Sequence, residues 1–140
     1  MKTDNELIAD FLGWKLIDCS IEHNKCFPDK IETGLWSFQR FNKKGNIIDH
    51  DGGGDCWSWD EGDMIDFKHW HRIMPILVEI ELMGYNVVIR CYDNKHYCNI
   101  MQNSKNIALG HGITKLDAIY NLIIEFIKWY NEKEKQSPNS

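Results

Sequence analysis

Residues 85–110 restrict the fold more than any other stretch, because their predicted strands are joined by turns too short for a crossover connection. Tyr85–Tyr92 and His96–Gln102 are predicted strands separated by the turn Asp93–Lys95, and Lys105–Gly110 is a possible third strand. Short turns join antiparallel neighbours, whereas parallel strands need a crossover of about a dozen residues. The sequence therefore predicts an antiparallel sheet in the second half of the chain.

Three segments have the apolar spacing of amphipathic helices. They are Asp4–Trp14, which Gly13 stops, His69–Met83, and a long segment from Thr114 to about Lys133. Thr3 or Asp4 can cap the first helix, and Thr114 is predicted to cap the last. Pro75 lacks an amide donor, so the second helix is predicted either to begin just before the proline or to kink there.

The segment between the first two helices is predicted to contain strands and loops. Lys15–Ile21 and Leu35–Phe41 have β-branched or alternating residues. The turn signal Asn42–Asn46 is followed by Ile47-Ile48, a possible hairpin partner. The polar stretch Glu22–Glu32 is predicted to be a loop.

The order helix, strands, helix, strands, helix indicates an α+β fold, in which an antiparallel sheet is packed by three helices. There is no internal repeat and no linker. We therefore expect residues 1–135 to form a single domain and residues 136–140 to form a disordered tail.

Charge is distributed unevenly along the chain, which has a net charge of −5. Residues 1–66 carry fourteen acids and seven bases, whereas residues 67–140 carry seven acids and nine bases. A negative surface repels phosphate backbones and anionic membranes, so nucleic-acid and membrane partners are not expected. The argument from repulsion is weaker for residues 67–140, because their bases outnumber their acids.

Several absences favour a cytoplasmic protein. No apolar run approaches the roughly 20 residues of a membrane helix, and the acidic start lacks the features of a signal peptide. An odd number of cysteines, five, fits reduced thiols.

The chain contains, in this order, the stretches NELIADFLGW (5–14), FKHWHRIMPILVEIELMGY (67–85) and TKLDAIYNLIIEFIKWYN (114–131). Together they resemble the phage ABA sandwich domain family, small proteins of prophages and bacterial genomes. The resemblance implies a helix-sheet-helix sandwich and a phage or mobile-element origin. The chain departs from the family at residues 69–72, where a Ser-Trp-Asp-Trp type sequence is usual, and in a longer acidic insert. The resemblance implies no activity, ligand or catalytic residue, because none is established for the family.

The acidic insert, residues 49–66, contains seven acids, four glycines and no lysine or arginine. Its carboxylates include four that offer oxygen ligands to a hard cation such as Ca²⁺: Asp49, Asp51, Asp55 and Asp60. An EF-hand frame starting at Asp49 fails, because position five is Gly53 and position twelve is Asp60. The insert is therefore either a solvated flexible loop or a metal-binding loop.

No motif points to catalysis. The chain has no nucleophile elbow, P-loop, dinucleotide fingerprint or Cys-x-x-Cys pair. Gly110-His111-Gly112 is predicted to be a tight turn between a strand and the last helix. We predict no catalytic residue and no cofactor.

Two tryptophans in the acidic insert form the candidate binding site. Trp57 and Trp59 would share one face of a strand, and exposed tryptophan is enriched at interface hot spots. With Asp49, Asp51, Asp55 and Asp60 they form a candidate protein-binding surface, and a small local core is the alternative. The broad face of the last helix, with Phe126 and Trp129, offers a possible homodimer contact.

From His69 onward, the order of elements resembles a double-stranded-RNA-binding domain. Such domains open their last helix with a basic cluster, whereas here only Lys115 is basic. The strand-strand-helix ending also resembles HicB-type antitoxins, whose partners are small RNA-cleaving toxins. We expect a non-enzymatic accessory protein of phage or mobile-element origin that binds another protein. The alternatives are a divalent-metal-dependent hydrolase or nuclease that uses the acidic insert and, as a minor one, a HicB-like antitoxin.

Overall fold

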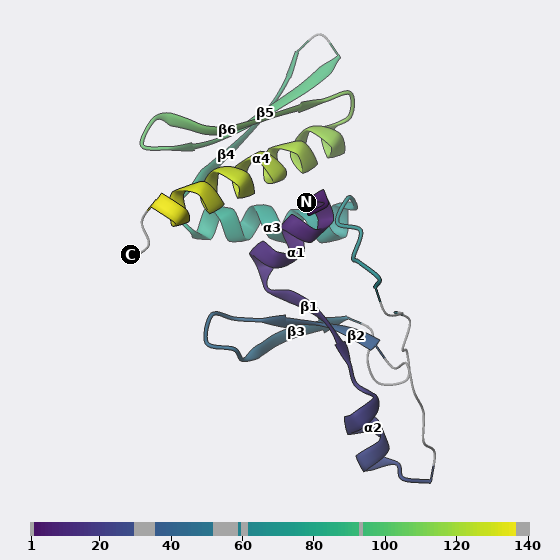
Figure 1. The fold of residues 1–140 in the computed structure, drawn as a ribbon. Helices are drawn as coiled ribbons and strands as arrows, with labels where there is room; N and C mark the ends of the chain where they lie inside the picture. Colours follow the sequence, from purple (N-terminus) through teal and green to yellow (C-terminus); the bar gives the residue numbers. More distant parts are fainter. Residues whose placement is uncertain (1, 30–35, 52–58, 60–61, 93, 137–140) are drawn as a thin grey trace. The chain divides into compact units, whose positions relative to one another are not determined.

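The computed structural model describes residues 2–29, 36–51, 59, 62–92 and 94–136. Within these residues it contains four helices and two three-stranded antiparallel sheets, so the predicted α+β fold is confirmed (Figure 1). The contacts within the chain group into two compact units, Met1–Ile65 and Asp66–Ser140, with one sheet in each. That residues 1–135 form one sandwich domain stays a prediction.

The first unit begins with helix α1, Asp4–Leu12, whose two ends are fixed by the residues that flank it. The side chain of Thr3 accepts a hydrogen bond from the backbone N–H of Glu6, which satisfies a free donor of the first turn. Gly13 ends the helix in the left-handed conformation, with φ of 86°. Both ends are therefore specified by local sequence, and the predicted stop at Gly13 is confirmed.

The sheet of the first unit has the order β1-β2-β3, with strands Trp14–Asp18, Trp36–Phe41 and Ile47–Asp51. The predicted turn between the second and third strands is confirmed, because the Asn42 side-chain oxygen accepts hydrogen bonds from the backbone N–H groups of Lys44 and Asn46.

Helix α2, Ser20–Cys26, was not predicted from the sequence. The segment was interpreted as the end of a strand followed by a polar loop, because seven residues give too few turns for an apolar period to be recognised. The Asp18 carboxylate accepts a hydrogen bond from the backbone N–H of Ser20, 2.9 Å away, and this contact supports the first turn. The hydrogen bond lowers the pKa of Asp18 below its ordinary value.

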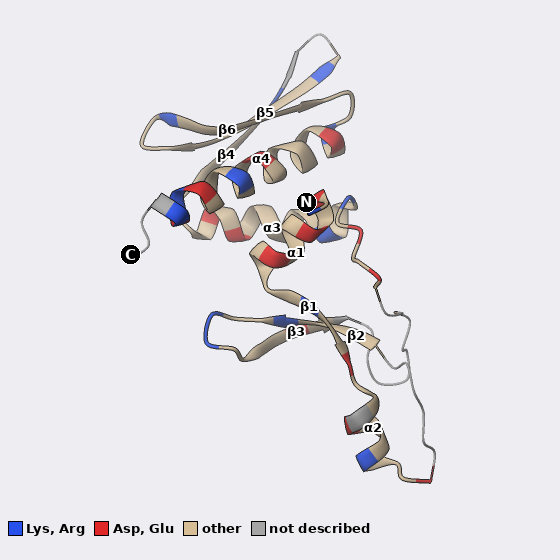
Figure 2. Cartoon of the chain, in the orientation of Figure 1, with Lys and Arg blue, Asp and Glu red and all other residues tan. Residues whose placement is uncertain are grey.

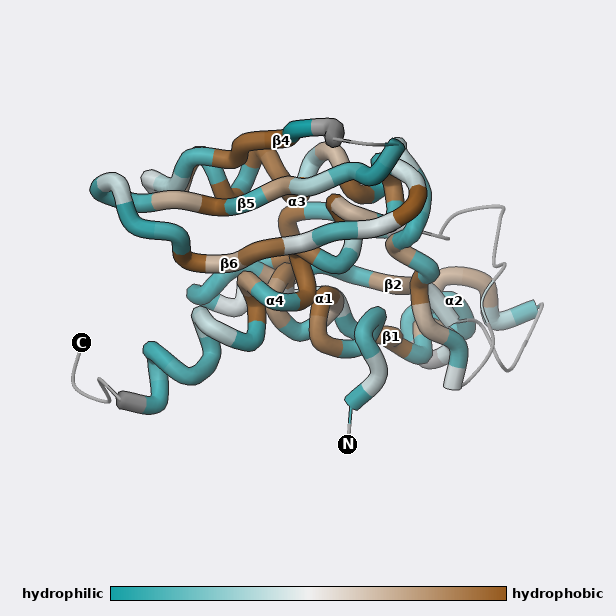
Figure 3. Tube along the Cα trace, turned by 90° about the horizontal axis from the view of Figure 1, so that it is seen from above, coloured by the Kyte–Doolittle hydropathy of each residue, from teal (hydrophilic) through white to brown (hydrophobic). Residues whose placement is uncertain are grey.

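The second unit has the order α3, β4, β5, β6, α4. The elements are Trp70–Leu82, Asn86–Tyr92, Lys95–Gln102, Lys105–Gly112 and Lys115–Gln136. The three strands form an antiparallel sheet in chain order, as the short turns predicted. Figure 3 shows apolar residues along β5 and β6, which in β6 form a continuous run in the middle of the strand.

The sequence predicted that the helix around Pro75 either begins just before the proline or kinks there. Its first residue is Trp70, so Pro75 lies inside the helix, and the prediction of a start just before the proline is wrong. Pro75 is exposed, so the carbonyl that loses its helical donor lies on the side of the helix that faces water.

The core of the second unit lies between the sheet and its two helices. Helix α4 packs across β5 and β6 and also contacts α3. Its broad apolar face is consequently used within the unit: Phe126 is fully buried, with its ring edge-on to Tyr85 at 5.0 Å. Phe126 is therefore not left over for a homodimer contact, whereas Trp129 is half-buried and a homodimer through the last helix stays a prediction.

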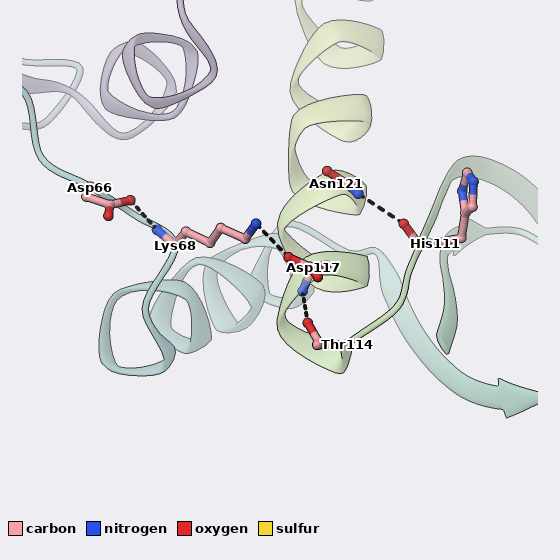
Figure 4. Close-up of polar contacts among 6 residues, drawn as sticks. All are labelled: Asp66, Lys68, His111, Thr114, Asp117 and Asn121. Carbon is pink, nitrogen blue, oxygen red and sulfur yellow. Dashed lines mark hydrogen bonds and ion pairs between the residues drawn. The ribbon is translucent and has the colours of Figure 1, made fainter. Parts of the chain in front are cut away.

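The N-terminus of α4 is held by a small polar network (Figure 4). Thr114 caps the helix as predicted, since its hydroxyl accepts a hydrogen bond from the backbone N–H of Asp117 at 3.0 Å. Lys68, just before α3, forms an ion pair with Asp117. Lys68 and, secondarily, Thr114 hold the pKa of the Asp117 carboxyl below its ordinary value.

Candidate functional site

Only part of the predicted binding site lies among the described residues. Asp49 is exposed on β3 and accepts a hydrogen bond from the backbone N–H of His50, and Asp51 ends the strand. Asp55, Trp57 and Asp60 lie outside the described residues. A binding surface on the acidic insert therefore stays a prediction.

Trp59 is described, and it packs on the sheet of the first unit. Its ring meets Phe38 edge-on, with 4.7 Å between the ring centroids, and its backbone forms an isolated bridge with Trp36. The side chain is half-buried, and its indole N–H has no hydrogen-bond partner among the described residues. These contacts agree with the local-core alternative for Trp59.

Metal ligands do not gather in the described part of the chain. No group of three or more His, Cys, Asp or Glu side chains lies close enough there to hold a metal ion. Cys19, which directly follows β1, instead contacts the side chains of Ser37 and Gln39.

The outer face of the second unit's sheet has a different character. Strands β4, β5 and β6 contain three lysines or arginines and no acid, although the chain as a whole is acidic (Figure 2). The register places Arg90, Tyr97 and His111 side by side in one row across the three strands. Because side chains alternate along a strand, these three lie on the face opposite the buried Cys98 and Gly110.

This outer face carries an open groove of about 650 Å³. We call it the sheet groove, and its lining residues are Arg90, Lys95, Tyr97, Cys98, Asn99, Asn106, Leu109, Gly110 and His111. The Tyr97 and His111 rings are nearly parallel, at 12° and with 6.3 Å between their centroids. Leu109 is 65% exposed, so the groove also offers an unprotected apolar contact.

Electrostatics in the sheet groove favour an anionic ligand. Arg90 and Lys95 are exposed, and neither forms an ion pair with any described residue. Asn99 donates a hydrogen bond to the Asn106 side-chain oxygen at 2.7 Å, which fixes both amides across β5 and β6. The groove therefore combines two cations that have no ionic partner among the described residues, two oriented amides, two parallel rings and an apolar side chain.

Close packing behind the sheet keeps the groove in shape. A Cβ atom added to Gly110 would lie 2.5 Å from the carbonyl oxygen of Ala118 and from the backbone nitrogen of Leu122, so α4 contacts the strand without an intervening side chain. Asn121 also donates a hydrogen bond to the His111 carbonyl at 3.0 Å, while the His111 ring lies on the side away from α4 (Figure 4). The glycines predicted to form a tight turn are thus the last residues of β6, where they allow this approach.

Cys98 is one of the lining residues of the groove, but its thiol is directed to α4 and is poorly suited to be a nucleophile. It donates hydrogen bonds to the carbonyls of Ala118, at 3.1 Å, and Gly110. Burial raises its pKa from 9.0 to about 11, so at pH 8 about one molecule in a thousand carries the thiolate.

Iodoacetamide at pH 8 is expected to modify Cys26 at least about tenfold faster than Cys98. Cys26 is exposed at the end of α2, whereas Cys98 is 2% exposed and keeps its proton. Peptide mass spectrometry over a time course measures both rates in one sample. In denaturant, where both thiols are accessible, the two modification rates should be similar. Equal modification rates in the folded protein would contradict the buried position of Cys98.

The sheet groove was not predicted from the sequence. The absence of acid from three consecutive strands was a usable signal, but which of the two sheet faces stays open depends on where α4 packs. The predicted order of a double-stranded-RNA-binding domain is present from α3 to α4, yet Lys115 begins α4 without neighbouring bases, and Lys68 is paired with Asp117.

Comparison with protein-family models, with curated proteins and with solved structures found no match for this chain. None of the helices in the described part of the chain combines the length and the apolar character that crossing a membrane requires.

Proposed function

We propose that this protein is a non-enzymatic binding module whose sheet groove holds an acidic segment of another protein. The observation that carries the proposal is the pair Arg90 and Lys95, which lie exposed and without an ionic partner among the described residues on an acid-free sheet face. Carboxylates are the groups that such cations bind through charge-assisted hydrogen bonds.

A protein segment fits the groove better than a nucleic acid does. Leu109 offers a large apolar contact that a phosphate backbone would not use, and only two cations line the groove, whereas nucleic-acid affinity rises with the number of phosphates neutralised. Strands β4 and β6 each pair only with β5 among the described strands. An extended peptide can therefore add its backbone to an edge while its side chains enter the groove.

The wider role rests on the sequence. The resemblance to the phage ABA sandwich domain family supports an accessory protein of phage or mobile-element origin, which acts in the cytoplasm. A HicB-like antitoxin would also bind a protein, but nothing in the groove favours a toxin over another acidic partner. The hydrolase or nuclease alternative gains no support from the described residues, which hold no cluster of metal ligands.

Replacing both groove cations, Arg90→Gln with Lys95→Gln, is expected to weaken binding of an acidic peptide at least about tenfold, because each carboxylate contact loses its charged partner. The probe is a fluorescein-labelled peptide of alternating glutamate and valine, which presents carboxylates on one face and apolar groups on the other. Fluorescence anisotropy measures the affinity, and the affinity of the original chain should fall as salt is raised.

The matched control is Lys128→Gln with Lys135→Gln. It changes the net charge of the chain equally, but on exposed lysines of α4 that already face Glu125 and Glu132. We expect the affinity for the peptide to change by less than about twofold, because salt screens the long-range attraction between the peptide and lysines outside the groove. Equal weakening by the two double variants, or tighter binding of single-stranded oligouridine than of the peptide, would refute the proposal.

A further inference from the structure

The two edge strands of the second unit's sheet, β4 and β6, are not equally protected against pairing with a further strand. The register of β6 with β5 shifts between Ile100 and Met101, which leaves one residue of β6 unpaired. Such a bulge twists an edge away from further pairing. The register of β4 with β5 is continuous from Asn86 to Tyr92, and β4 contains no proline or lysine. By these criteria β4 is the more open edge.

The hydrogen bonds of the sheet show which backbone groups point outward from each edge. The His111 carbonyl accepts a hydrogen bond from the Asn121 side chain of α4, so it points away from β5. Residues of an antiparallel strand alternate between bonding the neighbouring strand and pointing away from it. His111 is paired with Tyr97, which in turn is paired with Arg90. The alternation therefore directs the backbone groups of Arg90 toward β5 and those of Ile89 outward.

The hairpin between β4 and β5 gives the same assignment. Tyr92 and Lys95 are paired across a connection of two residues, and the pair that closes such a hairpin exchanges both hydrogen bonds. Alternation from Tyr92 again gives Val87 and Ile89 outward N–H and C=O groups. No hydrogen bond from another described residue reaches these groups. On the β6 edge, by contrast, α4 already occupies the outward carbonyl of His111.

The side chains of β4 fit an extended segment that is acidic on one face and apolar on the other. Arg90 is exposed on the groove face. A residue added opposite Arg90 would form a non-hydrogen-bonded pair, in which the two side chains lie closest, so a carboxylate there would meet the guanidinium. Ile89 lies on the other face, paired with the buried Cys98, yet it is 40% exposed. An apolar side chain of the added strand would cover Ile89.

A second copy of this chain is a poorer occupant of the β4 edge than an acidic segment. Strands β4, β5 and β6 contain no acid. Two β4 edges paired with each other would bring two Arg90 side chains onto neighbouring strands of one sheet, with no carboxylate between them. Like charges on neighbouring strands are destabilising, whereas opposite charges are favourable. The charge of the edge therefore selects a partner with carboxylates.

We propose that the acidic segment binds as a fourth strand on the β4 edge, with its carboxylates toward the sheet groove and its apolar side chains against Ile89. The added strand runs antiparallel to β4, because antiparallel pairing is the more stable arrangement per residue. This inference rests on the proposed function, and it adds the edge, the direction and the hydrogen-bonding residues of the bound segment.

Backbone methylation of the glutamate–valine peptide tests the edge and the direction together. The peptide residues opposite Val87 and Ile89 exchange hydrogen bonds with β4, and their side chains lie on the face of Ile89, so they are the valines. N-methylation of two central valines removes these donors and should weaken binding at least about tenfold. The matched control carries two N-methylated central glutamates, whose N–H groups point away from β4, and should change the affinity by less than about threefold. Fluorescence anisotropy measures both peptides.

Amide hydrogen exchange of the protein identifies the edge independently of the methylated peptides. In the complex with the unmethylated peptide, the N–H of Ile89 should exchange at least about tenfold more slowly, because it gains a hydrogen-bond partner. The N–H of Leu109 points outward from the β6 edge, by the same alternation as His111, and its exchange should not change.

Three results would overturn the proposal: equal effects of valine and glutamate methylation, a loss confined to the methylated glutamates, or unchanged exchange at Ile89. A loss confined to the glutamates would indicate the β6 edge or a parallel strand on β4. All three results leave the proposed function in place as long as the unmethylated peptide requires Arg90 and Lys95. A peptide that binds without these cations, or does not bind, contradicts the proposed function and this inference with it.

Discussion

Gly110→Ala is expected to destabilise the second unit by about 3 kcal/mol, near the upper end of the range for overpacking a core. The added Cβ would lie 2.5 Å from two backbone atoms of α4, in Ala118 and Leu122. A backbone inside a helix has no alternative rotamer to adopt, so the whole helix has to move away from β6. Denaturant unfolding followed by circular dichroism measures the loss, and amide hydrogen exchange locates it in β5, β6 and α4.

The neighbouring substitution Leu109→Ala serves as its control. Leu109 lies on the same strand but on the exposed face, so its truncation should change the unfolding free energy by no more than about 0.5 kcal/mol. Gly110→Ala should also weaken peptide binding in the sheet groove, because displacement of β6 separates Tyr97 from His111. A loss at Gly110 no larger than at Leu109 would mean that α4 does not approach the strand this closely.

Gly13→Ala is expected to lower the unfolding free energy of the first unit by about 3 kcal/mol, because two destabilising effects add. Its φ of 86° is unfavourable by about 1 kcal/mol for a residue with a side chain. The added Cβ would also overlap the backbone carbonyl of Phe41, whose N–H donates a hydrogen bond to the Gly13 carbonyl at 2.9 Å. Relief of this overlap separates β2 from the end of α1, at a cost comparable with overpacking.

The variant Gly45→Ala is the control that separates backbone strain from the overlap of the added Cβ atom. Gly45 has nearly the same φ, 85°, but an added Cβ would have no neighbour within 4 Å. It should therefore cost only the roughly 1 kcal/mol of backbone strain. Hydrogen exchange in β1, β2 and β3 reports on the first unit separately from the second. Equal costs at the two glycines would show that the contact between Gly13 and Phe41 contributes nothing.

Sequence reasoning was most successful where the decisive contacts are local. Thr3 or Asp4 was predicted to cap the first helix and Thr114 the last, and the Thr3 and Thr114 side chains accept the backbone hydrogen bonds that a cap requires. The turn at Asn42 and the stop at Gly13 are likewise specified by side chains within a few residues. Such interactions depend on the chain within one turn of the residue, so the sequence is sufficient to predict them.

The predictions failed where the outcome depended on a distant partner. A single sheet was expected, but the described strands hydrogen-bond only within their own half of the chain. Phe126 was expected to be available on the surface, but Tyr85 and the remaining core cover it. The candidate site was placed on the acidic insert. Of its six residues, Asp49 and Trp59 are described at the side-chain level, and Trp59 packs against Phe38.

The sequence by itself determined the periodic segments, the helix ends and the antiparallel pairing of β4, β5 and β6, because turn length and side-chain spacing act over a few residues. Only the tertiary structure decided which face of that sheet stays open. Helix α4 covers the face of Cys98 and Gly110 through contacts such as that of Cys98 with Ala118, 20 positions apart in the sequence. It leaves Arg90, Tyr97 and His111 exposed to solvent on the other face. The uneven charge noted in the sequence became a candidate binding surface only through that choice of face.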